Sequence, residues 1–248
     1  MRAGMLTGMI NLRGIGAHSV VAIAAGALLL AGCGSNEESS GGVSTAAPST
    51  PRDQLLLTPE EFPPNSKKVD LPKDRLEGAT ADLAGIQQSA TLSPEECAGT
   101  QQDLSTATKD LLGQSAVAGA TDEKSGVMYV EFVSGRAGNL AQITDGNRKC
   151  GEVTVTSSIE GRQITTVSKV ENLTAPAELK SVDAIVYRST TISTVGSGKP
   201  LTSTSYMGMA TLRGATVAVR VSALRDAVDE PTFRQLFIAA VRKVEKAD

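Results

Sequence analysis

The chain has 248 residues, with 24 basic and 27 acidic side chains and a formal net charge of −3. This balance argues against a nucleic-acid-binding protein, which needs clustered Lys and Arg to displace the counterions of the phosphate backbone. The single histidine, His18, lies in the predicted leader. Its position excludes Ser-His-Asp and Cys-His catalysis and His-ligated zinc from the rest of the chain. With four Phe, three Tyr and no Trp, the core must be mainly aliphatic.

Residues 1–32 have the three parts of a secretory signal peptide. Arg2 and Arg13 give a positively charged start, and an apolar run from Val20 to Leu30 follows. This run is too short, and too closely followed by polar sequence, to be a stable membrane span. The segment therefore predicts export. The initiator is one of three methionines: Met1, Met5 or Met9.

The apolar run ends in Leu30, Ala31, Gly32 and Cys33. This sequence resembles the bacterial lipobox, in which the Cys receives a diacylglycerol thioether and becomes the first residue after cleavage. An ordinary signal peptide followed by an accidental Cys is the alternative. The match at all four positions, with polar sequence directly after it, favours lipidation of Cys33. The chain is then expected to be anchored at the extracytoplasmic face of the cell membrane.

Residues 33–54 are predicted to be the lipidated Cys33 and a flexible tether. From Ser35 to Arg52 the sequence is mainly Ser, Gly, Thr, Ala and Pro, with almost nothing to bury. Such a composition does not form a packed core. A cell-wall spacer and plain disorder are compatible interpretations of this segment. Residues 55–248 are expected to form a single globular domain.

Two similar sequences predict helix starts. In residues 58–61, Thr58 is a helix cap and Glu61 completes a capping box, and Pro63-Pro64 ends the helix after about one turn. In residues 93–96, Ser93 is the predicted cap of a helix that extends to about residue 112. This second helix carries Cys97 in its first turn.

Beyond Gly126 the sequence alternates between apolar and polar residues, as is typical of β-strands. The predicted strands are 127–133, 153–159, 163–170, 182–195, 201–212 and 215–221. In the first of them Tyr129 and Phe132 lie on opposite faces. The turns at residues 160–162, 196–200 and 213–214 are short, which favours an antiparallel meander.

The residues after Asp229-Glu230-Pro231 predict an amphipathic C-terminal helix. Its apolar face consists of Phe233, Leu236, Phe237, Ala240, Val241 and Val244. Packing across one face of the sheet is the main interpretation, and a membrane-lying or partner-binding helix is the alternative. The elements together predict an α+β fold, with an antiparallel sheet of five or six strands covered by helices. The other face of the sheet, rich in Thr and Ser, is expected to face solvent.

With Cys33 lipidated, Cys97 and Cys150 remain. Two thiols in an exported protein most simply form a disulfide. A redox-active pair is the alternative, but there is no Cys-x-x-Cys spacing to support it. The bond would connect the second predicted helix to the start of the sheet.

Sequences that resemble catalytic or ion-binding motifs are incomplete. Residues 113–117 lack the final Gly of a nucleophile elbow, and no His is present to activate Ser115. Residues 196–199 lack the upstream Gly of a P-loop and fit a hairpin turn. Residues 145–147 are short of a calcium loop and are also predicted to be a turn. No catalytic, cofactor or metal residue is therefore predicted.

The lipobox at residues 30–33, the tether, and the sequences of residues 56–63 and 92–97 together resemble mycobacterial-type lipoproteins. The domain is most similar to an actinobacterial domain family of unknown function. More loosely, it is similar to the extracellular sensor domain of a mycobacterial serine/threonine kinase. The resemblance covers the region from about residue 55 to the C-terminus. It implies export, a helix-flanked antiparallel sheet and a ligand-sensing or binding role, with no functional residue beyond Cys33.

Three functions are open at this stage. The first is a non-enzymatic binding or sensing domain, held at the membrane by the lipid on Cys33, whose ligand is an envelope lipid, a glycan or a neighbouring protein. The second is an accessory or structural lipoprotein of an envelope protein complex. The third is a His-free hydrolase that uses Ser-Lys or carboxylate chemistry. No nucleic acid is expected as a partner, and no cofactor.

Overall fold

A computed structural model of the chain describes residues 46–71, 90–159, 161–223 and 228–248. These ranges belong to one compact unit, Gly42–Asp248. The predicted signal peptide, the lipobox Leu30-Ala31-Gly32-Cys33 and most of the tether lie outside the described residues. Their assignment therefore stays a prediction from sequence.

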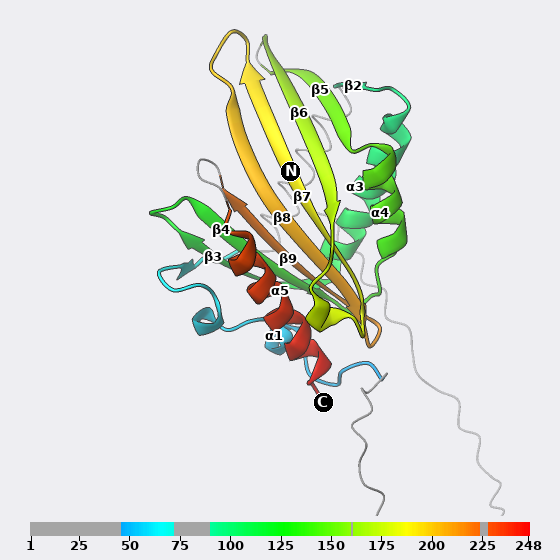
Figure 1. Cartoon of the computed structure of the whole chain (residues 1–248), viewed down its shortest axis with the longest axis vertical. Helices are drawn as coiled ribbons and strands as arrows, with labels where there is room; N and C mark the ends of the chain where they lie inside the picture. Colours follow the sequence, from blue (N-terminus) through cyan, green and yellow to red (C-terminus); the bar gives the residue numbers. More distant parts are fainter. Residues whose placement is uncertain (1–45, 72–89, 160, 224–227) are drawn as a thin grey trace, which may run out of the picture. The chain divides into compact units, whose positions relative to one another are not determined.

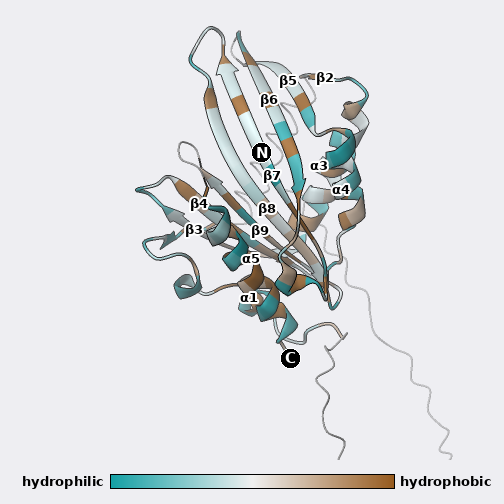
Figure 2. Cartoon of the chain, in the orientation of Figure 1, coloured by the Kyte–Doolittle hydropathy of each residue, from teal (hydrophilic) through white to brown (hydrophobic). Residues whose placement is uncertain are grey.

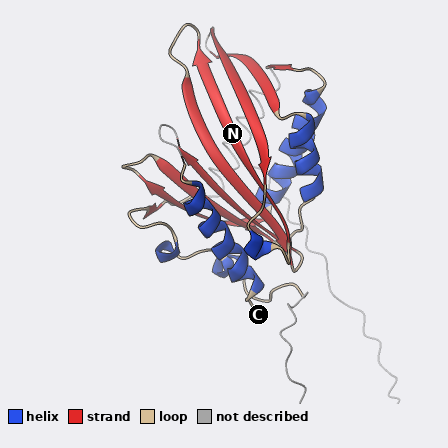
Figure 3. Cartoon of the chain, viewed as in Figure 1, coloured by secondary structure: helices blue, strands red, loops and turns tan. Residues whose placement is uncertain are grey.

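The described part of the chain is built on one antiparallel sheet of nine strands, which is drawn in red in Figure 3. The strands lie in the order β1-β3-β4-β9-β8-β7-β6-β5-β2. Their bounds are β1 Lys67–Lys68, β2 Thr91–Ser93, β3 Ser115–Asp122, β4 Val127–Ser134, β5 Glu152–Ile159, β6 Arg162–Leu173, β7 Asp183–Val195, β8 Leu201–Leu212 and β9 Ala215–Ala223. The predicted meander is confirmed, because β5 to β9 are neighbours in chain order.

The prediction of five or six strands was wrong, because β1, β2 and β3 gave no strand pattern. β1 and β2, at the two edges of the sheet, have two and three residues. β3 has the sequence Ser-Ala-Val-Ala-Gly-Ala-Thr-Asp, in which small residues hide the alternation. At Gly119 of β3 a Cβ would lie 2.5 Å from Cδ1 of Leu71, so a larger residue would require the Leu71 side chain to shift.

Helices cover both faces of this sheet. They are α1 Arg52–Leu55, α3 Cys97–Gly113, α4 Leu140–Lys149 and α5 Glu230–Glu245, with short 3-10 turns η1 Pro59–Glu61 and η2 Ala177–Leu179. In Figure 1, α5 and α1 lie together, well away from α3 and α4. The α5 helix packs on Val217 and Val219 of β9, whereas Leu140 of α4 packs on Ala218. Adjacent strand residues point to opposite faces, so the two helix groups lie on opposite faces.

The C-terminal helix confirms the predicted apolar face, since all six of its apolar residues are buried. Phe237 lies flat against the backbone of β8, where a Cβ added at Gly208 would come within 2.7 Å of the ring. Phe233 stacks on Tyr206 with 5.3 Å between ring centroids. Asp229 caps the helix by accepting a hydrogen bond from the backbone N–H of Thr232 at 2.9 Å.

Three local predictions need correction. Ser93 is not the cap of α3, because it belongs to β2 and pairs with Thr154 of β5; the helix begins only at Cys97. Residues 145–147 are not a turn but lie within α4, whose Gly146 packs against Leu104 of α3. The sheet face opposite α5, which is rich in Thr and Ser, is only partly open to solvent, because α3 and α4 lie over part of it. The capping box at Thr58 and Glu61 is confirmed.

A buried arginine ties the two ends of the described chain together. Arg213, in the β8–β9 turn, donates from Nε to the carbonyl of Ala46 at 2.7 Å. Its Nη1 donates to the carbonyl of Val244 at 3.3 Å and also to that of Ala247. The carbonyls of Val244 and Ala247 lie at the C-terminus of α5, where a positive charge is favourable. The first described residues therefore lie beside the end of α5.

A buried carboxyl lies under the N-terminal segment. Glu131 of β4 has no exposed surface, and its Oε2 accepts a hydrogen bond from the backbone N–H of Leu57 at 2.7 Å. Among the described residues Oε1 has no hydrogen-bond partner. Burial raises the pKa of Glu131 from 4.5 to about 7, against the lowering effects of the Leu57 hydrogen bond and of the Lys243 charge.

We expect Glu131 to make the domain less stable as pH rises from about 4.5 to above 7. The folded state then holds a proton that the unfolded state has lost, so stability falls with pH, by up to about 3 kcal/mol at about 1.4 kcal/mol per pKa unit. Glu131→Gln keeps an acceptor for Leu57 and should flatten the pH dependence of the unfolding free energy between pH 5 and 8. Chemical denaturation at several pH values measures this slope. Glu123→Gln, at an exposed site, should leave the slope unchanged; equal slopes in all three proteins would contradict the assignment.

Candidate functional site

A partly enclosed apolar cleft lies between α3, α4 and the sheet. Its volume is about 320 Å³, at the lower end of the range for small-molecule sites. The lining residues come from α3, from α4 and the loop before it, and from four strands. They are Leu104, Ala107, Thr108, Leu111, Leu112, Phe132, Gly138, Asn139, Gln142, Ile143, Asn147, Tyr187, Met207, Met209, Ala218 and Arg220.

The floor of the cleft lies within two neighbouring rows of side chains that cross the sheet. The strand register places Ile185, Met209, Ala218 and Phe132 in one row. Two residues further along each strand, the second row contains Tyr187, Met207, Arg220 and Val130. Ile185 and Val130 belong to these rows but do not line the cleft. The first row is wholly apolar, and the second brings in a phenol and a guanidinium.

The α3 helix forms one wall of the cleft and packs on the sheet only in part, through Leu111 against Met209 and Ala218. Its buried residue is Cys97, at the first position, while Leu104, Leu111 and Leu112 are only half-buried. Ala107 and Thr108, between them, are exposed and also line the cleft. This apolar side of α3 is therefore only partly covered, unlike that of α5, which is completely buried.

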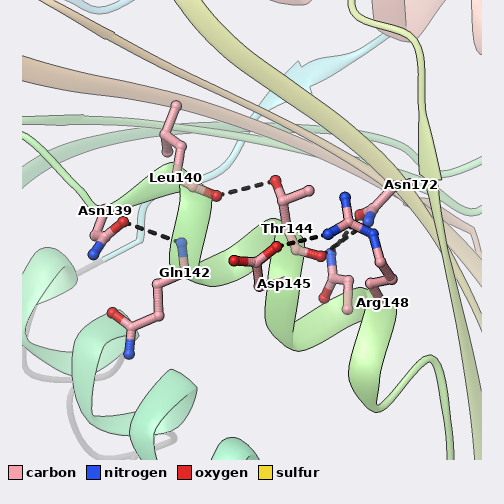
Figure 4. A network of polar contacts seen from close by, with 8 residues as sticks. Asn139, Leu140, Gln142, Thr144, Asp145, Arg148 and Asn172 are labelled. Atoms are coloured by element: carbon pink, nitrogen blue, oxygen red, sulfur yellow. Dashed lines mark hydrogen bonds and ion pairs between the residues drawn. The ribbon is translucent and has the colours of Figure 1, made fainter.

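The α4 helix is fixed by polar contacts at both ends, as Figure 4 shows. At its start, Oδ1 of Asn139 accepts a hydrogen bond from the backbone N–H of Gln142 at 3.0 Å. Near its end, Asn172 of β6 donates to the carbonyl of Thr144 at 3.1 Å and accepts from Asn147 at 3.0 Å. Leu140 is buried against Met209 and Ala218. The wall formed by α4 is therefore anchored to the strands of the floor.

One end of the cleft is closed by the loop before α4. The hydroxyl of Thr216, a buried residue of β9, donates to the carbonyl of Arg136 at 2.6 Å and accepts from the N–H of Gly138 at 2.7 Å. Gly138 itself lines the cleft. Thr216 lies two residues before Ala218 on the same face of β9, so the closed end adjoins the apolar row.

The opposite end of the floor is polar. Burial raises the pKa of Tyr187, and the charge of Arg220 partly opposes this shift, so the phenol stays protonated near neutral pH. Arg220 is exposed at the rim and makes no ion pair with a described residue. Beyond this row, Ser189, Ser205 and Ser222 continue the same face of β7, β8 and β9.

A disulfide joins the two helices that flank the cleft, as predicted. Cys97 at the start of α3 and Cys150 directly after α4 form the bond, with 5.7 Å between their Cα atoms. Both residues are buried with Val153 of β5. The bond therefore attaches both helices to the edge of the sheet.

The residues of the incomplete motifs have structural roles. The hydroxyl of Ser115 donates to the carbonyl of Leu111 at 2.7 Å, at the end of α3. Residues 196–199 form the β7–β8 hairpin turn, with Gly196 at φ +54°. Within the described ranges, no group of three or more His, Cys, Asp or Glu side chains could hold a metal ion. The same ranges contain no helix that is long and apolar enough to span a membrane.

Sequence reasoning did not find the cleft. Its residues come from six elements, and no motif links them. The available signals were the apolar spacing of Leu104, Leu111 and Leu112 in α3 and the Met207–Met209 pair on β8. Each of these is equally typical of an ordinary core.

Two broader depressions of about 650 and 590 Å³ border the N-terminal segment. The larger includes Lys68, Asp70 and Lys243 in its rim, and the smaller includes Arg52 and Arg213. Both are wide and open to solvent. The cleft under α3 and α4 is therefore the better candidate for a small-molecule site, because it is more enclosed and more apolar.

Comparisons with known proteins leave the family open. No protein-family model and no curated protein matches the chain. Among solved structures, a putative uncharacterized protein from Mycobacterium smegmatis is similar, with 16% identity and a TM-score of 0.42 over 75% of this chain and 92% of that chain. Similarity at this level carries no argument about function. The lipoprotein assignment and the resemblance to a kinase sensor domain stay predictions.

Removal of the disulfide should destabilise the domain. For a sequence separation of 53 between the cysteines, chain entropy predicts a loss of about 4 kcal/mol for the double variant Cys97→Ser, Cys150→Ser. Thermal unfolding measures this loss, and wild type treated with a reductant should show the same lower Tm. The reductant should not change the Tm of the double variant. An unchanged Tm after verified reduction would contradict the stabilising role.

Proposed function

We propose that this chain is a membrane-anchored lipoprotein whose domain binds or senses a small apolar ligand without catalysing a reaction. The observation that carries the proposal is the cleft of about 320 Å³ between α3, α4 and the sheet. One wall, α3, offers an apolar side that is only half-buried, because Leu104, Leu111 and Leu112 stay partly exposed although Leu111 packs against the cluster of Leu140, Met209 and Ala218. An apolar ligand in this cleft would remove that side from water, at about 25 cal/mol per Å² of buried apolar surface.

The contrast between the two faces of the sheet supports this proposal. On the α5 face, Phe233, Phe237 and Val241 leave no exposed surface at all. On the opposite face, Phe132, Ile143 and Met207 are only half-buried, although they line an apolar cleft. A protein interior is normally packed to the density of an organic crystal. The incomplete packing under α3 is therefore a feature that a ligand would complete.

The sequence supports a non-catalytic role. The domain after the leader contains no histidine, so it lacks the commonest general base near neutral pH. The polar groups of the cleft are amides, hydroxyls and one guanidinium, none of which is a strong nucleophile at neutral pH. These groups are suited to orienting a ligand by hydrogen bonds.

An accessory role in an envelope protein complex is the second candidate, and it also has an observation in its favour. The end of the β7–β8 hairpin exposes apolar side chains. Ile192, Val195 and Leu201 are 41%, 46% and 55% exposed. Val195 and Leu201 lie on one face of the hairpin and Ile192 lies on the other. Exposed apolar side chains at the end of a hairpin fit a contact with a protein partner.

The ligand is tested by native mass spectrometry of the processed protein, purified under mild conditions from an actinobacterial host. We expect a discrete added mass that disappears on denaturation, which separates a bound ligand from the covalent lipid on Cys33. Ala107→Trp fills the cleft from an exposed position on α3 and should abolish the added mass. Ala98→Trp, also exposed on α3 but outside the cleft, should retain it. A bare mass for wild type would overturn the proposed ligand site and favour the accessory role.

The lipid anchor is tested separately. Cys33→Ser removes the sulfur that would carry the diacylglycerol and should leave the protein unprocessed or release it from the lipid fraction. Detergent-phase partitioning and the mass of the mature N-terminus measure both effects. Gly34→Ser, at the next position, is the control and should partition like wild type. Unchanged cleavage and partitioning of Cys33→Ser would show that the anchor assignment is wrong.

A further inference from the structure

We infer that the cleft takes a single-chain amphiphile with an anionic head group. The chain would lie over the apolar row towards Thr216, and the head group would lie at Arg220 and Tyr187. This inference rests on the proposed function and specifies the class of ligand.

The floor of the cleft becomes more polar with distance from its closed end. The row nearest the closed end, with Ile185, Met209 and Ala218, has no polar side-chain group able to hydrogen-bond. The next row contains Tyr187 and Arg220, and the row after it contains Ser189, Ser205 and Ser222. Successive rows on one face are about 7 Å apart, because a strand rises by about 3.4 Å per residue. Figure 2 shows the same trend. The parts of β6, β7 and β8 near the β7–β8 hairpin are mostly pale, and the opposite ends of these strands are more hydrophobic.

The cleft has a single positive charge at its rim. Arg220 is the one charged residue among the described residues that line the cleft. Four other arginines of the described surface have carboxylate partners: Arg148 pairs with Asp145, Arg188 with Glu171, Arg234 with Glu230 and Arg242 with Glu245. Exposed Arg52, Arg136 and Arg162 also form no ion pair with a described residue, but none of them lines the cleft. The guanidinium of Arg220 forms no ion pair or hydrogen bond with a described residue. A guanidinium binds carboxylate, phosphate or sulfate oxygens through two parallel N–H donors, so its free donors favour an anion.

Tyr187 lies in the same row of side chains as Arg220. Met207 pairs with Tyr187 on one side and with Arg220 on the other, so the phenol and the guanidinium flank one methionine. Adjacent strands lie about 4.8 Å apart, which puts the two polar residues on strands about 10 Å apart. The Tyr187 hydroxyl has no hydrogen-bond partner among the described residues and, being protonated, can donate to an oxygen between the two.

The volume of the cleft limits the size of the ligand. A volume of about 320 Å³ equals that of about ten water molecules at about 30 Å³ each. Since a methylene group occupies a similar volume, this space holds one chain of about ten carbons and not two long chains. A free fatty acid and a single-chain phospholipid share this chemistry, and both occur at a membrane surface.

The test uses three probes with the same twelve-carbon chain: dodecanoate, dodecyltrimethylammonium and 1-dodecanoyl-lysophosphatidylglycerol. Each is titrated below its micelle concentration against the delipidated protein, in calorimetry. We expect wild type to bind dodecanoate about tenfold or more tightly than the cationic probe, because hydrogen bonds from Arg220 to a charged head group are stronger than neutral ones. Tighter binding of the lysophospholipid than of dodecanoate would assign the source to a lipid head group. The reverse order would assign it to a free fatty acid.

Arg220→Gln should remove the preference for the anionic probes, while Arg162→Gln, at an exposed position of the β5–β6 hairpin, should keep it. Tyr187→Phe should weaken both anionic probes and leave the cationic probe unchanged. Ala107→Trp should abolish binding of all three, which identifies the cleft as the site. Unchanged Tm values confirm that the variants fold.

Two results would overturn the inference. Equal binding of the anionic and cationic probes, unaffected by Arg220→Gln, would leave an apolar binding site with no head-group recognition, so the proposed function would stand without this refinement. Failure of all three probes to bind would exclude a single-chain amphiphile. In that case the proposed function is decided by native mass spectrometry, in which a bound mass sensitive to Ala107→Trp keeps the cleft as a site for another ligand.

Discussion

The packing of α5 on β8 and β9 is the interaction on which the other features of the domain depend. Phe237 lies against Gly208, and Phe233 stacks on Tyr206, so one face of the central strands is sealed by a fully buried helix. Because strand residues alternate between faces, the same strands present Met207, Met209 and Arg220 to the other side. The stability of the sheet is therefore secured on one face, and the opposite face is left for a cleft.

The two helix layers differ in how they are held. The α5 helix is held by apolar burial along its whole length, whereas α3 and α4 are held mainly at their ends. The Cys97–Cys150 disulfide joins them at one side, and Asn172 and Thr216 fix α4 and its preceding loop by hydrogen bonds. A wall held at its ends allows space beneath it, which a continuous hydrophobic contact would close. In this arrangement the disulfide and the polar contacts supplement the limited packing of Leu140, Leu111 and Ile143.

The N-terminal segment is joined to the domain through contacts with distant parts of the chain. Arg213 binds the carbonyls of Ala46 and of the C-terminus of α5, and Glu131 accepts a hydrogen bond from Leu57. If Cys33 carries the lipid, these contacts determine which side of the domain lies nearest the attachment point of the tether. The buried Glu131 also links the stability of this segment to pH in the range around neutrality.

Local sequence determined the elements whose signals are complete within a short window. The apolar face of α5, the strands β4 to β9 and the capping box at Thr58 and Glu61 all follow from spacing and from turn residues, and so does the availability of two cysteines for pairing. Tertiary structure decided the rest. β1 and β2 exist only because longer strands offer them hydrogen bonds, and β3, whose small residues hide the alternation, is defined by its pairing with β4. Ser93 was drawn into β2 by pairing with β5, and Gly146 is accommodated in α4 because Leu104 packs against it. The cleft depends on strand register, which brings Tyr187, Met207 and Arg220 side by side, and no local pattern contains that information because the three residues lie on different strands.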